Sequence, residues 1–270
     1  MAGQRNGAVG IGNDSEGRPD PVLYERRGAA AIVTINRPER RNAVDGGTAD
    51  ALHEAYERFV ADDGALAMVL TGAGDQAFCA GADLKNAVSL FPRLESAGGP
   101  LGFTRLTAPK PTIAAISGWA LAGGFELALW CDLRICAEGT TFGFAERRWG
   151  VPLIDGGTQR LPRIVGAGRA LDLVLTGRMV ELDEAMAIGL VTQRVPAGEQ
   201  LNTALELAER LAEFPRETML ADRAALLAGL GKPLADGLAI EAANGMATVH
   251  VAAAGANRFA GGEGRGGAGV

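Results

Sequence analysis

Two glutamates, Glu126 and Glu146, are candidates for acid/base chemistry because of the residues around them. Glu126 lies in the first turn or so of a predicted helix, and Glu146 lies between aromatic residues and a Trp-Gly turn. A partly desolvated carboxyl group has a raised pKa, which suits proton transfer near neutral pH. Each also has a simpler interpretation: Glu126 as a surface acid that complements the helix dipole, and Glu146 as a surface acid paired with Arg147 or Arg148.

Two glycine-rich loops each follow a predicted strand and expose main-chain N–H groups. The first covers residues 78–85, and the second covers residues 118–128, which lead from a strand into a helix. Small side chains let a ligand approach the backbone, and a helix N-terminus adds positive potential. Such N–H groups stabilise an anion or a developing oxyanion. Glycine is also common in ordinary turns after strands, so the first loop alone indicates little.

Other catalytic patterns fit the chain less well. Residues 72–77 match the G-x-G-x-x-[GA] dinucleotide-binding pattern, but no helix is predicted at these glycines and no acid ends the next predicted strand. A G-x-S-x-G nucleophile elbow is absent, and the two histidines, His53 and His250, lie far from the glycine-rich loops in sequence. The three cysteines have no CxxC spacing, so we predict no metal site.

The composition limits the classes of partner. Of the 270 residues, 47% are hydrophobic and 21% are charged, with a formal net charge of −6. An acidic chain lacks the basic stripe of a nucleic-acid binder. No apolar run reaches the roughly 18 residues of a membrane span, and residues 1–20 lack the apolar stretch of a signal peptide. We therefore expect no nucleic acid, no membrane and a cytoplasmic location.

The elements that position the loops alternate between strands and helices. The strand-like runs are almost wholly apolar, which is typical of parallel strands buried on both faces. This alternation predicts an α/β fold. We predict strands over residues 22–24, 31–35, 67–71, 112–116 and 133–137, and helices over 45–60, 119–131, 202–214 and 218–230.

In chain order, these segments resemble the landmarks of the crotonase superfamily, whose best-known member is enoyl-CoA hydratase. The resemblance runs from about residue 22 to residue 195, and its ordered matches together are far more specific than any one of them. It implies a spiral of repeated strand–strand–helix turns and a C-terminal helical region that builds trimers, often paired into hexamers. The matches are N-R-P-E-R-R-N-A-V at 36–44, F-C-A-G-A-D-L-K at 78–85, W-A-L-A-G-G-F-E-L-A-L-W-C-D at 119–132, F-G-F-A-E at 142–146 and G-G-T-Q-R-L-P at 156–162.

This resemblance also divides the chain. Residues 21–198 would form the crotonase-like spiral core, and residues 199–260 the C-terminal helical trimerisation region. The Gly-rich and polar residues 1–20 have little to bury and are expected to be a disordered leader. Residues 261–270 are nearly all glycine and are expected to be a flexible tail.

The resemblance implies roles for individual positions. The N–H groups of Ala82 and Gly123 would form an oxyanion hole for a thioester carbonyl, and Glu126 and Glu146 align with the two hydratase glutamates. The expected partner is an acyl-CoA thioester, and no separate cofactor is expected because coenzyme A is part of the substrate. The residues expected to bind CoA are Arg41, Ala43, Ala80, Ala82, Asp83, Leu84, Lys85 and Gly123.

Retention of both glutamates favours hydratase chemistry, in which a water held between the carboxylates adds to a 2-enoyl double bond. Glu126 would activate the water, and Glu146 would exchange a proton with the α-carbon. Two alternatives stay open: a double-bond isomerase of the same fold, acting on enoyl-CoA or dienoyl-CoA, and a protein that binds acyl-CoA without catalysis.

One segment departs from the hydratase pattern. Many hydratases read I-P-G-A-G-G-T-Q where this chain reads P-L-I-D-G-G-T-Q at residues 152–159. Asp155 would face the acyl pocket, near the position of an aspartate in dienoyl-CoA isomerases, or it would be an N-cap for the next helix, which we favour. Trp149 and Ile154 are expected to narrow or reshape the acyl pocket.

Overall fold

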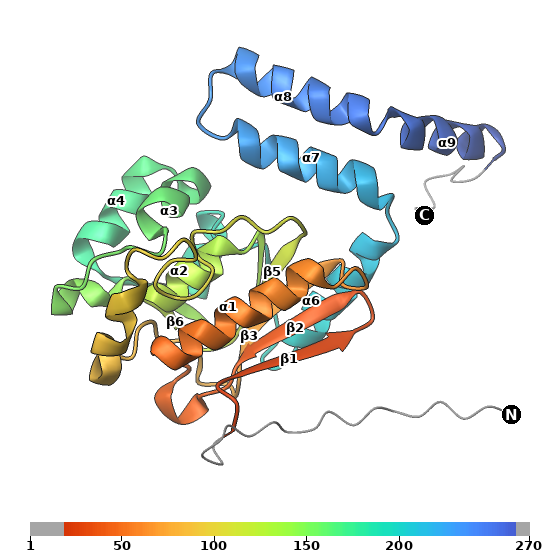
Figure 1. The fold of residues 1–270 in the computed structure, drawn as a ribbon. Coiled ribbons are helices and arrows are strands. Elements are labelled where there is room, and N and C mark those ends of the chain that lie inside the picture. Colours follow the sequence, from red (N-terminus) through yellow and green to blue (C-terminus); the bar gives the residue numbers. More distant parts are fainter. Residues whose placement is uncertain (1–18, 263–270) are drawn as a thin grey trace, which may run out of the picture.

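The computed structural model describes residues 19–262, which contain a six-stranded sheet (Figure 1). Its strand order is β1-β2-β3-β5-β7-β10; β1 pairs antiparallel with β2, and all other neighbours pair in parallel. Parallel strands covered on both faces need apolar sequences, and β3 and β5 are almost completely buried. The strands are β1 (Val22–Arg27), β2 (Ala30–Ile35), β3 (Ala67–Gly72), β5 (Thr112–Ile116), β7 (Leu133–Ala137) and β10 (Gln193–Val195).

A second sheet has four short strands in the order β4-β6-β8-β9. Along the chain, β3 is followed by β4, β5 by β6 and β7 by β8, and a helical segment follows each pair. The chain therefore forms the expected α/β spiral of strand–strand–helix turns. The strands are β4 (Ala77–Cys79), β6 (Trp119–Leu121), β8 (Thr141–Gly143) and β9 (Met179–Glu181).

The short strands correct two local expectations. Residues 119–131 were expected to be helical throughout, but residues 119–121 form β6 and the helix α2 begins only at Gly123 (Gly123–Trp130). Residues 78–83 were expected to continue as a loop, but Phe78 and Cys79 belong to β4. β6 pairs in parallel with both β4 and β8, and this pairing sets their conformation. A strand of three residues is too short to show an alternating pattern in the sequence.

Helices cover both faces of the six-stranded sheet. On one face, α6 (Gln200–Ala212) inserts Ala204 and Ala208 against a layer of small and β-branched strand residues. The other face packs against the main core, which includes α1 (Gly46–Ala61) and α2. Asp45 caps α1, because its carboxylate accepts a hydrogen bond from the N–H of Thr48 at 3.0 Å. The remaining elements of this part are η1 (Pro38–Arg40), η2 (Leu84–Arg93), η3 (Ala145–Trp149), α3 (Gly157–Val165), α4 (Ala167–Thr176) and α5 (Leu182–Ala187).

Three C-terminal helices stand apart from this body in Figure 1: α7 (Arg216–Gly229), α8 (Leu234–Ala247) and α9 (Val249–Ala260). α7 and α8 lie side by side. The predicted helices at 202–214 and 218–230 correspond to α6 and α7, shifted by one or two residues. The predicted leader and tail lie almost wholly within residues 1–18 and 263–270, outside the described part of the chain.

Candidate active site

The two glycine-rich loops meet where β6 turns into α2. Gly81 has φ +89°, and a β-carbon added there would lie 2.8 Å from the main-chain nitrogen of Gly123. Ala122, directly before α2, has φ 52° and ψ −127°, a backbone conformation that residues other than glycine rarely adopt. The close approach of the loops therefore requires glycine at residue 81 and a strained turn at residue 122.

The N–H groups of Ala82 and Gly123 are free to bind a ligand. Neither donates a hydrogen bond to any acceptor within residues 19–262. An isolated bridge fixes the Ala82 loop, with Val44 N–H donating to Gly81 O and Asp83 N–H donating to Val44 O, each at 2.8 Å. Both free donors belong to residues that line a cavity of about 540 Å³. Two unpaired N–H groups on residues that line one cavity are compatible with an oxyanion hole.

Glu126 projects from the first turn of α2 into the same cavity and is only 3% exposed. Its Oε1 accepts hydrogen bonds from the N–H groups of Gly157, at 2.7 Å, and Asp155, at 3.1 Å. Burial raises the pKa of Glu126 to about 8, with smaller contributions from the charges of Asp155 and Glu146. The interpretation of Glu126 as a surface acid is therefore wrong.

Glu146 lies in the first turn of η3 and lines the same cavity, as does Arg105. It is 6% exposed, and neither carboxylate oxygen has a hydrogen-bond partner within the described residues. Arg147, one of the two arginines that the simpler interpretation would pair with Glu146, donates to Val174 O instead. Burial raises the pKa of Glu146 to about 7. An unpaired buried carboxyl group is costly, and such groups concentrate at functional sites.

The rest of the cavity is mainly apolar. The predicted acyl-pocket residues Trp149, Ile154 and Asp155 all line it, and Trp149 remains 71% exposed at its edge. An apolar cavity with a few polar groups at one end suits a ligand that has an apolar chain and a single polar centre. Most of its other apolar lining residues come from η2, from η3 and from the segments beside these two elements: Ala80, Leu84, Ala87, Leu90, Phe91, Leu94, Pro100, Leu101, Ala145, Val151 and Pro152.

Comparison with known proteins identifies the family. The sequence model of the family described as enoyl-CoA hydratase/isomerase matches residues 25–262. The chain belongs to the enoyl-CoA hydratase/isomerase family. It is 38% identical over 224 residues to a short-chain-enoyl-CoA hydratase from Clostridium acetobutylicum, covering 82% of this chain and 86% of that protein. It is 36% identical over 225 residues to a crotonyl-CoA hydratase from Syntrophomonas wolfei, with 82% and 86% covered.

Solved structures agree with this membership. The crystal structure of an enoyl-CoA hydratase from Mycobacterium marinum superposes with a TM-score of 0.84 at 36% identity, covering 89% of this chain and 96% of that one. A second one, from Bacillus anthracis, gives a TM-score of 0.80 at 32% identity, with 85% and 91% covered. The predicted crotonase superfamily and spiral fold are thus confirmed.

Asp155, where this member departs from the hydratase pattern, is not a helix cap. The N-cap of α3 is Gly156, with φ +106°, and no side chain caps that helix. The Asp155 carboxylate is buried, and its Oδ1 accepts hydrogen bonds from Leu101 N–H, at 3.1 Å, and from the Thr104 hydroxyl. The favoured N-cap interpretation is wrong because partners far away in sequence bind this side chain.

The residues expected to bind CoA separate into two groups. Ala80, Ala82, Leu84 and Gly123 line the cavity, whereas the other four do not. Asp83 holds the loop itself: it accepts from Lys85 N–H at 3.1 Å and forms a 3.1 Å ion pair with Arg37, a residue that the sequence did not single out. The remaining members lie on the chain beside this loop: Arg41, whose guanidinium stacks over Trp119 at 4.8 Å and whose carbonyl accepts from Ala80 N–H, and Ala43.

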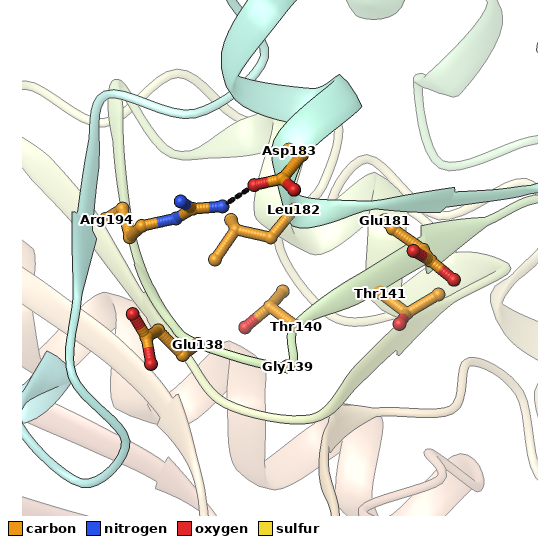
Figure 2. A pocket seen from close by; sticks show the side chains of 8 residues that line it. All are labelled: Glu138, Gly139, Thr140, Thr141, Glu181, Leu182, Asp183 and Arg194. Atoms are coloured by element: carbon orange, nitrogen blue, oxygen red, sulfur yellow. Dashed lines mark hydrogen bonds and ion pairs between the residues drawn. The ribbon is translucent and has the colours of Figure 1, made fainter.

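A separate polar cavity of about 430 Å³ lies between β8, β9 and the start of α5 (Figure 2). Figure 2 shows Arg194 pointing toward Asp183, with which it forms an ion pair. Glu138 and Glu181 lie farther from Asp183. None of its lining residues was predicted to be functional. Over residues 19–262, no group of His, Cys, Asp or Glu side chains is arranged to hold a metal ion, and no helix has the length and hydropathy to cross a membrane.

Proposed function

We propose that this protein is an enoyl-CoA hydratase, which adds water to the double bond of a 2-enoyl-CoA thioester. The observation that carries the proposal is the pair of buried carboxyl groups, Glu126 and Glu146, lining one cavity beside the free N–H groups of Ala82 and Gly123. Relatives named short-chain-enoyl-CoA hydratase and crotonyl-CoA hydratase, at 38% and 36% identity, support it.

The geometry supports a division of roles. The thioester oxygen would accept hydrogen bonds from Ala82 and Gly123, which stabilises the enolate formed when water attacks the β-carbon. Glu126 is fixed by two amide donors and would take a proton from that water. Glu146 has no other partner and would deliver a proton to the α-carbon. Because these groups stabilise the enolate and move the protons, the proposed reaction needs no cofactor beyond the CoA of the substrate.

The proposal extends to the rest of the substrate and to the assembly. We propose that the 36–44 and 80–85 loops, including Arg41, Ala43, Asp83 and Lys85, hold the CoA moiety, since they adjoin the donor loop. A homotrimer or a dimer of trimers is supported by large apolar side chains exposed on the C-terminal helices. The exposed apolar residues of α7, α8 and α9 include Leu226, Leu234, Leu238, Met246, Val249 and Phe259.

A cytoplasmic location is supported by three cysteines that are buried and free.

The test is a substrate panel with product analysis. Crotonyl-CoA mixed with the protein should lose the absorbance of its conjugated double bond and yield a 3-hydroxyacyl-CoA. Glu146→Gln, which keeps the shape of the side chain but cannot exchange the proton, should lower kcat by about 100- to 10,000-fold. Saturable binding of acyl-CoA without any turnover would reject the proposal and favour a binding protein.

One observation favours a second candidate, a double-bond isomerase. Asp155 places a third buried carboxyl group at the cavity, beyond the two that hydration needs. In the same panel, turnover of 3-enoyl-CoA or dienoyl-CoA substrates with no addition of water would favour this candidate.

A further inference from the structure

Asp155 joins two segments that line the cavity. Its carboxylate binds the N–H of Leu101 and the hydroxyl of Thr104, both in the irregular segment between η2 and β5. Thr104 is fully buried, and Asp155 is 4% exposed, so water cannot replace these bonds at little cost. The side chain therefore fixes one wall of the cavity.

The main chain of Asp155 binds the second segment, through Glu126 and Arg160. Its N–H donates to Glu126 Oε1 at 3.1 Å, and its carbonyl accepts from Arg160 Nη1 at 2.8 Å. The other end of the Arg160 guanidinium donates to the carbonyl of Thr104 at 2.5 Å. Asp155, Thr104 and Arg160 thus form a closed ring of hydrogen bonds, and the Glu126 carboxylate is attached to this ring.

The wall that Asp155 fixes is in contact with the oxyanion donor. A β-carbon added to Gly123 would lie 2.6 Å from Cδ1 of Leu101, so the Leu101 side chain packs directly over Gly123. A shift of Leu101 would change the room available to the thioester oxygen at the Gly123 N–H. Displacements of about 1 Å at such a site can cost about 100-fold in rate.

We propose that Asp155 is a positioning residue for hydration: its carboxylate holds Leu101 against Gly123, while its N–H holds Glu126 in the same hydrogen-bonded ring. This proposal rests on the proposed hydratase function and assigns a task to the residue at which the chain departs from the hydratase pattern. In this proposal Asp155 acts through Gly123 and Glu126, because its Oδ1 accepts from Leu101 and Thr104 while its N–H donates to Glu126.

The chain offers a matched control for this arrangement. Asp62, at the C-terminus of α1, also accepts from a main-chain N–H, that of Gly64 at 3.0 Å, and from a hydroxyl, that of Tyr24 at 3.3 Å, but it lines no part of the cavity. Variants Asp62→Asn and Tyr24→Phe therefore remove the same kinds of group at a distance from the site. They should leave kcat and KM for crotonyl-CoA at the wild-type values in whatever protein remains folded.

Four variants of the ring test the proposal against that control. Asp155→Ala should lower kcat about 10- to 100-fold and change KM much less, because it displaces the donors rather than the CoA loop. Thr104→Val should lower kcat about fivefold, the equivalent of one neutral hydrogen bond. Asp155→Asn keeps the acceptor oxygen and should restore most of the rate; Asp155→Glu, which cannot fit the same ring, should not.

Asp155→Asn carries a second readout, the pH profile of kcat. The groups that face Glu126 are Asp155, Glu146 and Arg160, and the charge of Asp155 raises the pKa of Glu126. Removing that charge should move the corresponding limb of the profile to lower pH. A residue with a purely structural role elsewhere, such as Asp62, should leave the profile in place.

The outcomes separate this proposal from the proposed function. Binding of acetoacetyl-CoA, whose enolate the oxyanion hole would stabilise, is measured alongside hydration, and Asp155→Ala should weaken it at least tenfold. A wild-type protein that hydrates nothing rejects the hydratase, and the binding assay then still tests Asp155. If Asp155→Ala keeps the wild-type kcat, acetoacetyl-CoA binding and pH profile, the positioning role is overturned. If Asp155→Ala does not fold, the same result in Asp155→Asn and Thr104→Val overturns it. Asp155→Asn as inactive as Asp155→Ala overturns it in favour of direct proton transfer.

Discussion

The two ends of helix α2 differ in how completely their polar groups are paired. At the N-terminal end, Gly123 has a free N–H, Ala122 is strained, and the nearby Glu146 carboxyl group has no partner. At the C-terminal end, the Arg134 guanidinium donates to Cys131 O at 2.6 Å, Leu190 O at 2.7 Å and Ala128 O at 3.3 Å. One short helix thus has an open end and a closed end.

The closed end extends to the C-terminal helices. Asp132 accepts from Arg223 of α7 at 2.9 and 3.0 Å, and Arg223 also donates to the carbonyl of Ala108. Trp130 donates its indole N–H to Leu106 O at 2.8 Å. Unpaired donors and raised pKa values at one end are useful only if the helix cannot shift to relieve them. The difference indicates that the paired end anchors α2, so that the open end stays strained and reactive.

The largest expected effect comes from breaking the closed end. Arg134→Ala removes a buried cation and leaves several carbonyl oxygens without donors, so it should lower the free energy of unfolding by about 3–5 kcal/mol. The measurement is chemical denaturation of the full-length protein. The matched control is Arg194→Ala, which removes an exposed ion pair with Asp183 and should cost less than about 1 kcal/mol.

Arg134→Ala also tests whether the paired C-terminal end of α2 holds the open N-terminal end in place. If α2 is anchored by Arg134, the residual folded protein should show a lower kcat as well, because Gly123 and Glu126 move with the helix. An Arg134→Ala protein with reduced stability but unchanged kcat would show that the two ends are independent.

A smaller effect on the free energy of unfolding should come from replacing Glu146, the ionisable carboxyl group buried near the open end of α2. The pKa of Glu146 is about 7 in the folded protein, whereas an exposed glutamate has a pKa of about 4.3. Between these values the folded protein holds a proton that the unfolded chain has released. The contribution of Glu146 to the free energy of unfolding should therefore fall as the pH rises from about 4.3 to 7 and then level off.

Glu146→Gln cannot ionise, so its gain in stability over the wild type should grow across that interval, by on the order of 2 kcal/mol between pH 4 and pH 8. Thermal or chemical unfolding at a series of pH values measures it. The comparison variant is Glu184→Gln, because the ion pair with Arg178 lowers the pKa of the exposed Glu184 and should give the opposite sign. A pH-independent difference for Glu146→Gln would contradict the burial of an ionisable carboxyl group at the open end.

How far the sequence predicts these two ends depends on how local the determinants are. β2, β3 and β5 were predicted because each is an almost continuous apolar run, whereas β1 was predicted only over residues 22–24 because its second half is charged. The two glutamates were found because they lie in motifs that match the family. β4, β8 and β9 were not predicted as strands, because three residues carry no period and only pairing in the second sheet makes them extended.

Non-local partners account for the errors at the site. Asp155 lies before a helix, where N-capping is the local expectation, but its partners Leu101 and Thr104 lie 54 and 51 residues away. Glu146 lies beside Arg147, where an ion pair is the local expectation, but Arg147 reaches Val174 O, 27 residues away. No local pattern marks such contacts, so the sequence left both the desolvated and the surface interpretation of Glu146 open, and the ring around Asp155 could not be predicted.

The smallest expected effect concerns the strain at Ala122. Its backbone conformation costs a residue with a β-carbon about 1–3 kcal/mol, and glycine adopts it freely. Glycine also loses more conformational freedom on folding, by about 0.5–1 kcal/mol relative to alanine. Ala122→Gly should therefore raise the free energy of unfolding by about 1 kcal/mol, seen as an increase in Tm of about 2 °C.

The control is Ala120→Gly, two residues earlier in β6, where φ is not positive and the side chain is buried. That substitution should destabilise the protein, because it relieves no strain and loses apolar contact. If Ala122→Gly raises the free energy of unfolding and Ala120→Gly lowers it, the strain is assigned to residue 122 itself. Equal destabilisation by both would mean that the open end of α2 stores no strain in this turn, and that its difference from the closed end lies only in the unpaired N–H and carboxyl groups.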